Sequence, residues 1–516
     1  MKVSLLGVPG NMGSEVVKAI VNEEYISMIS LLIHDKKGAN KIIKLLKKSG
    51  KDYRVQYGTV ANIMDVKKTI EDCDYVINMA AVIPPLSDKK PQSAIEANEF
   101  GPEIIINAIE EIKENQPKLI HISTIGLYGD RNYKHPFAEV GDPLIISPFD
   151  LYALTKMRGE FKVLESDINE WVVIRQTALL YDSLLMKNVS DGLMFHTPFN
   201  VPLEWATSRD TAILMRNILR RDNKHELDDR NFWKHCFNIG GGEANRVTGY
   251  DTFKLGFEMI GCGVEDFFDT DYNALRNFHG SWYSDAYKLN DLFDFQHEDI
   301  VGFWKRVLNT HKYFKLACIL PKKLLKSLVI KPLLKDDNAP YYWYKNKDEA
   351  KILAYFKGSE EFKKIPQDWK DFPLLVKGKN CDGGDIDYAA LVKTPTRLEH
   401  FFDIDKDRSL ISIEDLRKVA EARGGKLLED KFVTGDIYRK VHWVNADGVE
   451  FMARPHTVLY CGHWINISYK EYAWDFDHLA KTDKMIAQIW YDAHDKDENH
   501  YYWYDHHFAA HYKDID

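Results

Sequence analysis

The segment SPFDLYALTKMRGE, residues 147–160, places Tyr152 and Lys156 four positions apart in a stretch with a helical pattern. Side chains at this spacing lie on the same face of a helix, so a phenol and an ammonium group would be neighbours. A nearby ammonium favours the phenolate form of tyrosine, and such a tyrosine can move a proton to or from a substrate oxygen. The alternative interpretation is ordinary surface decoration of a helix, because this spacing is common. The segments before and after the pair have to distinguish between these two interpretations.

The first twenty or so residues have the pattern of a dinucleotide site. KVSLLGVPGNMGSEVVKAIV predicts a short apolar strand, a glycine turn and an amphipathic helix. Gly7 permits the tight turn, Gly10 lets the backbone approach a pyrophosphate, and Gly13 lets the helix pack closely on the strand. The phosphates would lie at the helix N-terminus, beside Asn11 and Met12, where free N–H groups and the helix dipole favour negative charge.

The next predicted strand, MISLLIHD, ends at Asp35. An acidic residue at this place accepts hydrogen bonds from the ribose hydroxyls of the adenosine and repels the 2'-phosphate of NADP. Lys36 and Lys37 follow directly and could soften that repulsion, although simple solvation explains them better. The sequence therefore favours NAD(H) over NADP(H).

Five later segments follow in a familiar order: DYVINMAAVIPP, EANEFGPEIIINAI, KLIHISTIGLYGD, SPFDLYALTK and WVVIRQTALLYD. In this order and at these spacings, residues 1–310 resemble the NAD-dependent epimerase/dehydratase family, the extended short-chain dehydrogenase/reductases. The resemblance implies an α/β fold, with a Rossmann-type doubly wound parallel sheet and a small substrate-binding lobe mainly at 183–209 and 245–310. It also implies a homodimer, since dimers are usual in the family.

The resemblance implies a role for each matching residue. Thr124 matches the catalytic hydroxyl, with Ser123 as its neighbour and fallback, and Tyr152 and Lys156 match the catalytic pair. The residues at cofactor-binding positions, including the family's structural asparagine and the end of the strand beside the nicotinamide, are Thr59, Val60, Ala80, Ala81, Asn98, Arg175, Gln176 and Thr177. Two positions depart from the family pattern, because Asn78 stands where the family usually has His and Thr59 where it usually has Asp.

These residues suit hydride transfer between a nicotinamide and a carbon that bears oxygen. Tyr152 would move the proton on that oxygen, and Thr124 would hydrogen-bond the oxygen and fix its geometry. Lys156 would hold the nicotinamide ribose and, together with the positive ring of oxidised nicotinamide, lower the pKa of Tyr152 from about 10 towards neutrality. The hydride chemistry itself belongs to the cofactor.

Two departures argue against a nucleotide sugar as substrate. The family's nucleotide-sugar enzymes usually carry a diphosphate-binding arginine where this chain has 202–204, Pro-Leu-Glu. Its dehydratases tend to place Asp-Glu after the catalytic hydroxyl, where this chain has Ile125 and Gly126. Simple oxidoreduction of a small apolar or ring-bearing molecule is therefore the leading hypothesis. A nucleotide-sugar epimerase or dehydratase and a cofactor-sensing binding protein remain as alternatives.

Aromatic residues are dense in the predicted substrate lobe. NFHGSWYSDAYKLN, residues 277–290, predicts substrate contacts from His279 and Trp282, to which the loop residue Val82 and Ser123 are added. Pockets of this composition suit apolar or ring-bearing ligands. The alternative, that these side chains are ordinary core or a packed turn, stays open.

The rest of the chain predicts a helical connector, residues 311–374, and a C-terminal α+β domain, residues 375–516. The connector is rich in lysine and leucine, which indicates helices packed on the main domain or, alternatively, a peripheral contact with an anionic membrane. Residues 412–470 resemble a treble-clef zinc module. Its ligand places hold Leu427, Asn445, Ile465 and Ser468, so we expect the module's shape without a metal. The tail, rich in aromatic residues and histidine, is expected to wrap the main domain or a dimer mate.

Composition excludes several classes of protein. The net charge is -9, with no long basic run, which argues against a nucleic-acid partner. The 6 cysteines are scattered without a C-x-x-C pair, so a reducing cytoplasm fits better than a disulfide framework. We see no secretory signal, and no run of about 18 apolar residues predicts a transmembrane segment. The sequence predicts a cytoplasmic, bacterial-type oxidoreductase.

Overall fold

The computed structural model describes residues 1–184, 192–311, 321–380, 382–465 and 473–503. At its centre is a seven-stranded parallel sheet of strand order β11-β7-β5-β4-β1-β2-β3. Its strands are β1 (Lys2–Val8), β2 (Met28–Ile33), β3 (Asp52–Tyr57), β4 (Tyr75–Asn78), β5 (Lys118–Thr124), β7 (Trp171–Gln176) and β11 (His235–Ile239). The chain builds outwards from β1 to one edge and then from β4 to the other, which confirms the predicted doubly wound fold.

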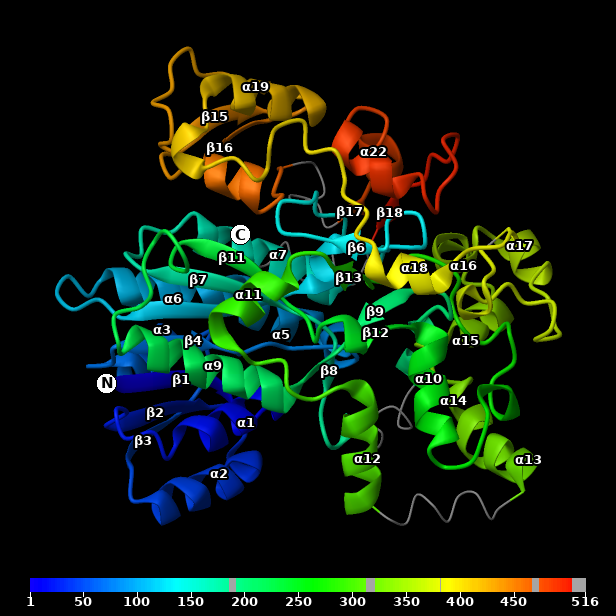
Figure 1. The fold of residues 1–516 in the computed structure, drawn as a ribbon, viewed down its shortest axis with the longest axis horizontal. Coiled ribbons are helices and arrows are strands. Elements are labelled where there is room, and N and C mark those ends of the chain that lie inside the picture. Colours follow the sequence, from blue (N-terminus) through cyan, green and yellow to red (C-terminus); the bar gives the residue numbers. More distant parts are fainter. Residues whose placement is uncertain (185–191, 312–320, 381, 466–472, 504–516) are drawn as a thin grey trace.

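Helices cover both faces of this sheet (Figure 1). They are α1 (Asn11–Ile20), α2 (Lys36–Ser49), α3 (Ile63–Ile70), α6 (Gly101–Glu110), α7 (Leu151–Leu164), α9 (Ser208–Asp222) and α11 (Ala286–Phe293). Successive strand side chains point to opposite faces, so Leu5 joins the core beneath α1 and α9 while Leu6 joins the core beneath α3 and α6. Burial on both faces explains why the strands are continuous apolar runs.

The substrate lobe lies beside the carboxyl ends of the central strands. It is built from short strand pairs: β8 (Leu179–Leu180) with β10 (Ala206–Thr207), β9 (Pro202–Glu204) with β12 (Arg246–Thr248), and β6 (Phe137–Ala138) with β13 (Trp282–Tyr283). Two helices, α10 (Gly249–Glu258) and α12 (Ile300–Thr310), flank these pairs. Most aromatic side chains of the lobe are core: Phe195, Phe199 and Trp282 are buried.

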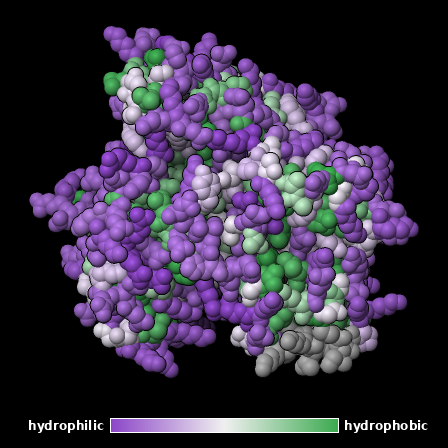
Figure 2. Space-filling model, in the orientation of Figure 1, coloured by the Kyte–Doolittle hydropathy of each residue, from purple (hydrophilic) through white to green (hydrophobic). Residues whose placement is uncertain are grey.

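The connector packs against this lobe. Its helices are α13 (Lys322–Leu325), α14 (Lys331–Leu333), α15 (Pro340–Asn346), α16 (Glu349–Phe356) and α17 (Ser359–Lys363). Helix α18 (Tyr388–Lys393) follows the connector in the chain. Leu324 and Leu328 are 46% and 65% exposed, while Lys322 pairs with Asp266 at 2.5 Å. Figure 2 shows a mostly hydrophilic face, with hydrophobic residues gathered over the part that holds α10 and α14. A membrane contact remains a prediction. No helix in the described ranges is long and apolar enough to cross a membrane.

The C-terminal part lies above one end of the sheet (Figure 1). Helix α19 (Ile413–Ala422) packs with an antiparallel sheet of β14 (Lys426–Leu427), β15 (Val441–Val444) and β16 (Glu450–Ala453), and has a core of its own. Of the expected ligand places, Asn445 accepts hydrogen bonds from two backbone N–H groups of its turn and donates to the carbonyl of Ile465, and Ser468 lies outside the described residues. Asn445 therefore organises this turn through hydrogen bonds.

One large core crosses the predicted domain boundaries. Phe199 of the lobe, Trp343 of the connector and Trp474 of the C-terminal part belong to the same buried cluster. The last described elements, α21 (Phe476–Leu479), α22 (Lys484–Trp490) and the pair β17 (Ala473–Trp474) with β18 (Tyr502–Trp503), lie against the lobe. Arg276 of the lobe binds both carboxylate oxygens of Glu498 at 2.9 and 3.0 Å. The division at 310 and 374 thus separates stretches of chain that share packing.

Candidate active site

A cavity of about 710 Å³ lies at the carboxyl ends of β1, β4, β5 and β7, on either side of the point where the strand order reverses. Most of the predicted site residues line it: Gly7, Gly10, Asn11, Met12, Gly13, Asp35, Thr59, Val60, Ala80, Ala81, Val82, Ser123, Thr124, Tyr152, Lys156, Gln176, Thr177 and His279. Asn98 and Trp282 are not among its lining residues. The fold therefore brings the predicted cofactor and catalytic residues to one cavity.

The glycine turn is shaped for close approach of backbone and ligand. Gly7 has φ +98°, and a Cβ there would lie 2.5 Å from the carbonyl carbon of Met79, so no other residue fits. A Cβ at Gly13 would lie 2.9 Å from the Gly7 carbonyl oxygen. Helix α1 has Gly10 as its N-cap and no side-chain cap, which leaves its first N–H groups available to an anion. This cradle fits the pyrophosphate of a dinucleotide.

Asp35 lines the cavity just after the end of β2. Its carboxylate caps α2 by accepting from the N–H groups of Lys37 and Gly38, at 2.9 and 3.2 Å. The ammonium of Lys36 lies 4.9 Å from the centre of the Tyr57 ring. Lys36 is thus placed against an aromatic ring, while the negative charge of Asp35 lines the cavity.

Replacing Asp35 with asparagine is expected to improve NADPH binding about tenfold relative to NADH, because it removes one negative charge that faces the 2'-phosphate. Asparagine caps a helix as well as aspartate does, so α2 should keep its start. Titration of both reduced cofactors by fluorescence measures the change. Equal effects on the two cofactors would show that Asp35 does not select between them.

Two asparagine side chains hold the loop after β4 through hydrogen bonds to its backbone. Asn78 accepts from the N–H of Ala80 at 3.2 Å, and its side-chain nitrogen lies 3.1 Å from Nδ1 of His121. Asn98 is fully buried and binds both the N–H and the carbonyl of Val82, each at 2.9 Å. Asn98 therefore shapes the cavity wall from outside and, contrary to the cofactor contact expected from the sequence, does not line the cavity.

The predicted catalytic residues come from β5 and α7. Thr124 ends β5, and its Oγ1 accepts from the N–H of Gly126 at 3.1 Å. Lys156 is 2% exposed and donates from Nζ to the carbonyl of Ile122 at 2.6 Å. Ser123 is buried beside them, and its Oγ has no hydrogen-bond partner. An unpartnered hydroxyl on the cavity wall fits a site built for a polar ligand.

The acidities of the pair differ from the expectation drawn from the sequence. Burial raises the pKa of Tyr152 to about 12, a hydrogen bond with Thr124 opposes this rise, and the charge of Asp150 adds to it. Burial lowers the pKa of Lys156 to about 8, against the charge of Glu160. The protein's own groups therefore hold Tyr152 in its protonated form, the form that donates a proton to a carbonyl oxygen.

Neighbouring residues at the end of β7 face different surroundings. Gln176 and Thr177 line the cavity, as expected. Arg175 points the other way and is fully buried: it binds Glu160 through Nε and Nη2, at 3.2 and 2.6 Å, and the Cys461 carbonyl at 2.7 Å. Arg175 therefore does not line the cavity, contrary to the place expected for it beside the nicotinamide, and its charge is neutralised by Glu160.

The C-terminal part reaches the same buried carboxylate. His463 lies 2.9 Å from Glu160 through Nε2, and both side chains are 0% exposed. Burial alone would raise the pKa of Glu160, but the charge of Arg175 and the hydrogen bond with His463 outweigh it and lower that pKa. Sequence reasoning missed Glu160 and His463, although Glu160 lies one turn after Lys156 on the same helix.

Of the segment 202–204, Leu203 lines the cavity and Glu204 does not. Glu204 is buried and binds Arg246 at 2.9 Å and the N–H of Tyr283 at 3.0 Å, so it presents no charge to a ligand. Its neighbours Leu203 and Trp205 line the cavity instead. Trp282 is fully buried and donates to the carbonyl of Val247, so the expected substrate contact is replaced by packing in the lobe.

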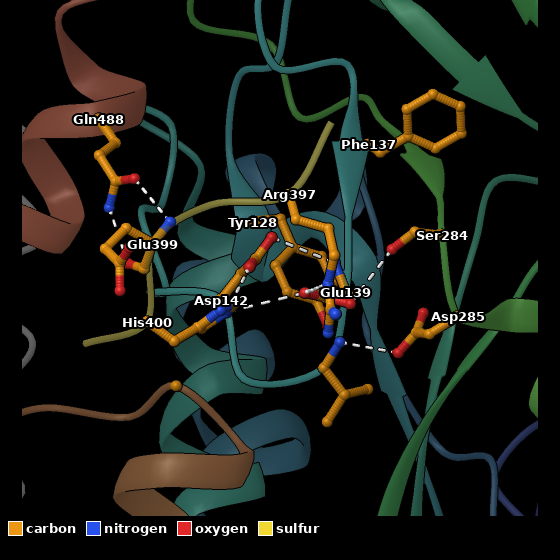
Figure 3. Close-up of polar contacts among 12 residues, drawn as sticks. Tyr128, Phe137, Glu139, Asp142, Ser284, Asp285, Arg397, Glu399, His400 and Gln488 are labelled. Carbon is orange, nitrogen blue, oxygen red and sulfur yellow. Dashed lines mark hydrogen bonds and ion pairs between the residues drawn. The ribbon is translucent and has the colours of Figure 1, made fainter. Parts of the chain in front are cut away.

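A second polar cluster lies outside the cavity, where residues 397–400 meet the lobe (Figure 3). Asp142 binds Arg131 and His400, each at 3.0 Å, and Glu139 binds Arg397 at 2.9 Å. The ligand atoms of Glu139, Asp142 and His400 are close enough to hold a metal ion. The guanidinium groups of Arg131 and Arg397 already neutralise the carboxylates of Asp142 and Glu139, so the charge balance does not favour a cation site. We call this cluster of ion pairs the latch.

Because His400 belongs to the latch, we expect the free energy of unfolding of the protein to depend on pH. Burial would lower the pKa of His400, but its hydrogen bond to Asp142 and the charge of Asp142 raise that pKa above 6.5. The contribution of His400 is therefore fully present below pH 6.5 and is lost as the pH rises through the raised value. We expect His400→Gln to lower the free energy of unfolding by about 1–3 kcal/mol at mildly acidic pH, and by less at alkaline pH. Denaturant unfolding at both pH values tests this, and an equal loss at both would contradict it.

Comparisons with known proteins found one matching family model and several similar solved structures. Residues 4–183 match the model of the 3-beta hydroxysteroid dehydrogenase/isomerase family. Among solved structures, UDP-glucuronic acid 4-epimerase from Bacillus cereus, in complex with UDP-glucuronic acid and NAD, is 19% identical, with a TM-score of 0.46 over 61% of this chain and 100% of that chain. The dTDP-glucose 4,6-dehydratase from Bacillus anthracis, in complex with NAD, is 15% identical, with a TM-score of 0.47 over 62% and 99%. The UDP-glucose 4-epimerase from Bifidobacterium longum, in complex with NAD+ and UDP, is 16% identical, with a TM-score of 0.47 over 61% and 100%. The residues matched by the family model include Tyr152 and Lys156.

Proposed function

We propose that this protein is an oxidoreductase that transfers a hydride between NAD(H) and the hydroxyl or carbonyl carbon of a small ring-bearing or apolar substrate. The observation that carries the proposal is the meeting of the glycine cradle with Thr124, Tyr152 and Lys156 in one cavity. Bound nicotinamide supplies the hydride. The chain's own residues bind and orient the reactants and move the proton.

Each catalytic residue has a role that its contacts support. Tyr152, protonated because of burial, donates to the carbonyl oxygen during reduction and takes the proton back during oxidation. Thr124 hydrogen-bonds the same oxygen and Ser123 offers a second, unpartnered hydroxyl. Lys156, fixed by the Ile122 carbonyl, holds the ribose beside the reacting carbon.

The composition of the cavity wall supports an apolar substrate. The apolar part of the cavity wall is formed by Val82, Ile83, Leu86, Leu179, Leu203, Trp205 and Phe278, with Lys90, Ser93 and Glu96 among its polar lining residues. Among the residues that the structure describes, no arginine lines the cavity, and a diphosphate group is usually bound by one. The description of the matching family names hydroxysteroids, which are ring-bearing molecules of this kind.

The test is oxidation of NADH and NADPH by the purified full chain, followed through the absorbance of the reduced nicotinamide. The panel holds cyclic ketones, steroid-like ketones and aldehydes, and UDP-sugars are assayed separately for interconversion. We expect turnover of a cyclic or steroid-like ketone, with NADH preferred. Interconversion of a UDP-sugar without net oxidation of NADH would overturn the proposed substrate class.

A further inference from the structure

His279 and Asp150 form a close pair at the substrate side of the cavity. Nδ1 of His279 lies 2.5 Å from Oδ2 of Asp150, and the histidine side chain is 27% exposed towards the cavity that it lines. Oδ1 of the same carboxylate accepts from the N–H of Ala153 at 2.9 Å and so caps α7. One carboxylate therefore holds both the first turn of the catalytic helix and the imidazole ring.

The pair stands next to the reacting groups. Asp150 precedes Tyr152 by two residues at the start of α7. A Cβ built on Gly126 would lie 3.5 Å from Oγ1 of Thr124 and 3.7 Å from Cγ of His279, so the imidazole and the catalytic hydroxyl share this corner. Phe278 stacks on the imidazole ring at 4.6 Å and fixes its plane.

We propose that His279 and Asp150 act as a charge pair that sets the proton affinity of Tyr152, with His279 as a positioning residue that works through Asp150. A protonated His279 offsets the Asp150 carboxylate, which leaves Tyr152 a better proton donor. A neutral His279 leaves that carboxylate unopposed, so Tyr152 holds its proton more tightly. The inference rests on the proposed function, in which Tyr152 moves the substrate proton.

The electrostatics of the corner agree with this role. Burial would lower the pKa of His279, but the charge of Asp150 and the hydrogen bond to it raise that pKa above 6.5. The charge of Asp150 in turn raises the pKa of Tyr152. His279 therefore keeps its proton to a higher pH than a free imidazole does.

Other charged groups face this corner and need controls. Asp88 of α4 (Leu86–Lys89) has its pKa raised to about 7 by burial and by the charge of Asp150. Burial lowers the pKa of His196 to about 4, and the charge of Lys351 of α16 adds to this, so His196 stays neutral. The charge of Lys351 also lowers the pKa of Asp88, against the larger effect of burial. Asp88 therefore titrates near neutral pH at this corner, as Lys156 does beside Tyr152, and Asp88 serves as the control.

The experiment measures the ionisation of Tyr152 without any substrate. The ultraviolet spectrum of the full chain is titrated with base, with and without saturating NAD+, and the titration of Tyr152→Phe is subtracted to leave the signal of Tyr152. Asp150→Asn should move the Tyr152 midpoint down by about one pH unit. His279→Arg, which keeps a positive charge beside Asp150 at alkaline pH, should also move it down, while His279→Gln should leave it in place, because an imidazole is already neutral at the pH where Tyr152 ionises. Asp88→Asn should leave the midpoint in place.

A downward shift in His279→Arg with none in His279→Gln distinguishes a charge pair from a structural contact, since loss of packing would affect both variants. The inference is overturned if His279→Arg leaves the midpoint in place or moves it up, if His279→Gln shifts it as far as His279→Arg does, or if Asp88→Asn has the effect of Asp150→Asn. Asp150→Ser, which also caps a helix, replaces Asp150→Asn if that variant does not fold. Because the readout needs no turnover, failure to find a substrate would weaken the proposed function and leave this test intact.

Discussion

Replacing Tyr152 with phenylalanine is expected to lower kcat by about 10²–10⁴-fold while NADH binding stays unchanged. The ring remains in the cavity wall, and only the hydroxyl that moves the proton is removed. Because burial holds the pKa of Tyr152 at about 12, this hydroxyl keeps its proton at neutral pH and can donate it to the substrate oxygen. Steady-state turnover of a ketone identified from the panel and fluorescence titration of NADH measure the two quantities.

Tyr181→Phe is the matched control, since Tyr181 also lines the cavity but lies directly after β8, away from α7. It should retain most of the activity. A Tyr152→Phe enzyme that keeps more than about a tenth of wild-type kcat would show that another group moves the proton.

The second large effect is expected for Glu160→Gln, which breaks the buried cluster of Arg175, Glu160 and His463. We expect a loss of about 3–5 kcal/mol in the free energy of unfolding, because Arg175 is 0% exposed and would keep its charge without a carboxylate. Denaturant unfolding measures this loss. Limited proteolysis should also show faster cleavage after residue 375, since His463 connects the C-terminal part to this cluster.

Glu103→Gln supplies the control for this prediction. Glu103 of α6 pairs with Lys162 of α7 at 2.5 Å, with side chains 48% and 27% exposed, and such surface pairs contribute about 0–1 kcal/mol. If Glu160→Gln and Glu103→Gln cost the same, the buried cluster does not hold α7 and the C-terminal part together.

Local sequence patterns predicted the cofactor half of this protein. The apolar runs and the spacing of Gly7, Gly10 and Gly13 are local features, and the geometry they imply depends on neighbours only a few residues away. Tyr152 and Lys156 share a helical face for the same reason. A parallel sheet then brings the ends of its strands to one edge, which is why residues as far apart as Asp35 and Gln176 meet in one cavity.

The parts that the sequence did not predict depend on contacts between distant segments. His279 and Asp150 are 129 residues apart, and His463 and Glu160 are 303 residues apart. No local period signals such a pair. Trp282 belongs to a dense aromatic segment that suits a ligand wall and a core equally well, and only packing against Phe137 at 5.4 Å assigns it to the core.

The C-terminal part illustrates the same limit. Its helix and strands are visible in the sequence, but its contacts with α7 and with the latch at Asp142 are not. Those contacts place His463 and His400 against the catalytic helix and the lobe. We therefore expect the C-terminal part to be needed for a stable catalytic helix.

The most direct test of the account is the binding of NADH to the purified full chain, followed by energy transfer from tryptophan to the bound nicotinamide. Trp205 lines the cavity and provides a donor within it. We expect saturable binding at one site, competition by NAD+, and weaker binding in Lys156→Met. A chain that is folded and shows no saturable binding of NADH or NADPH would contradict the claim that this cavity holds a nicotinamide cofactor beside Tyr152.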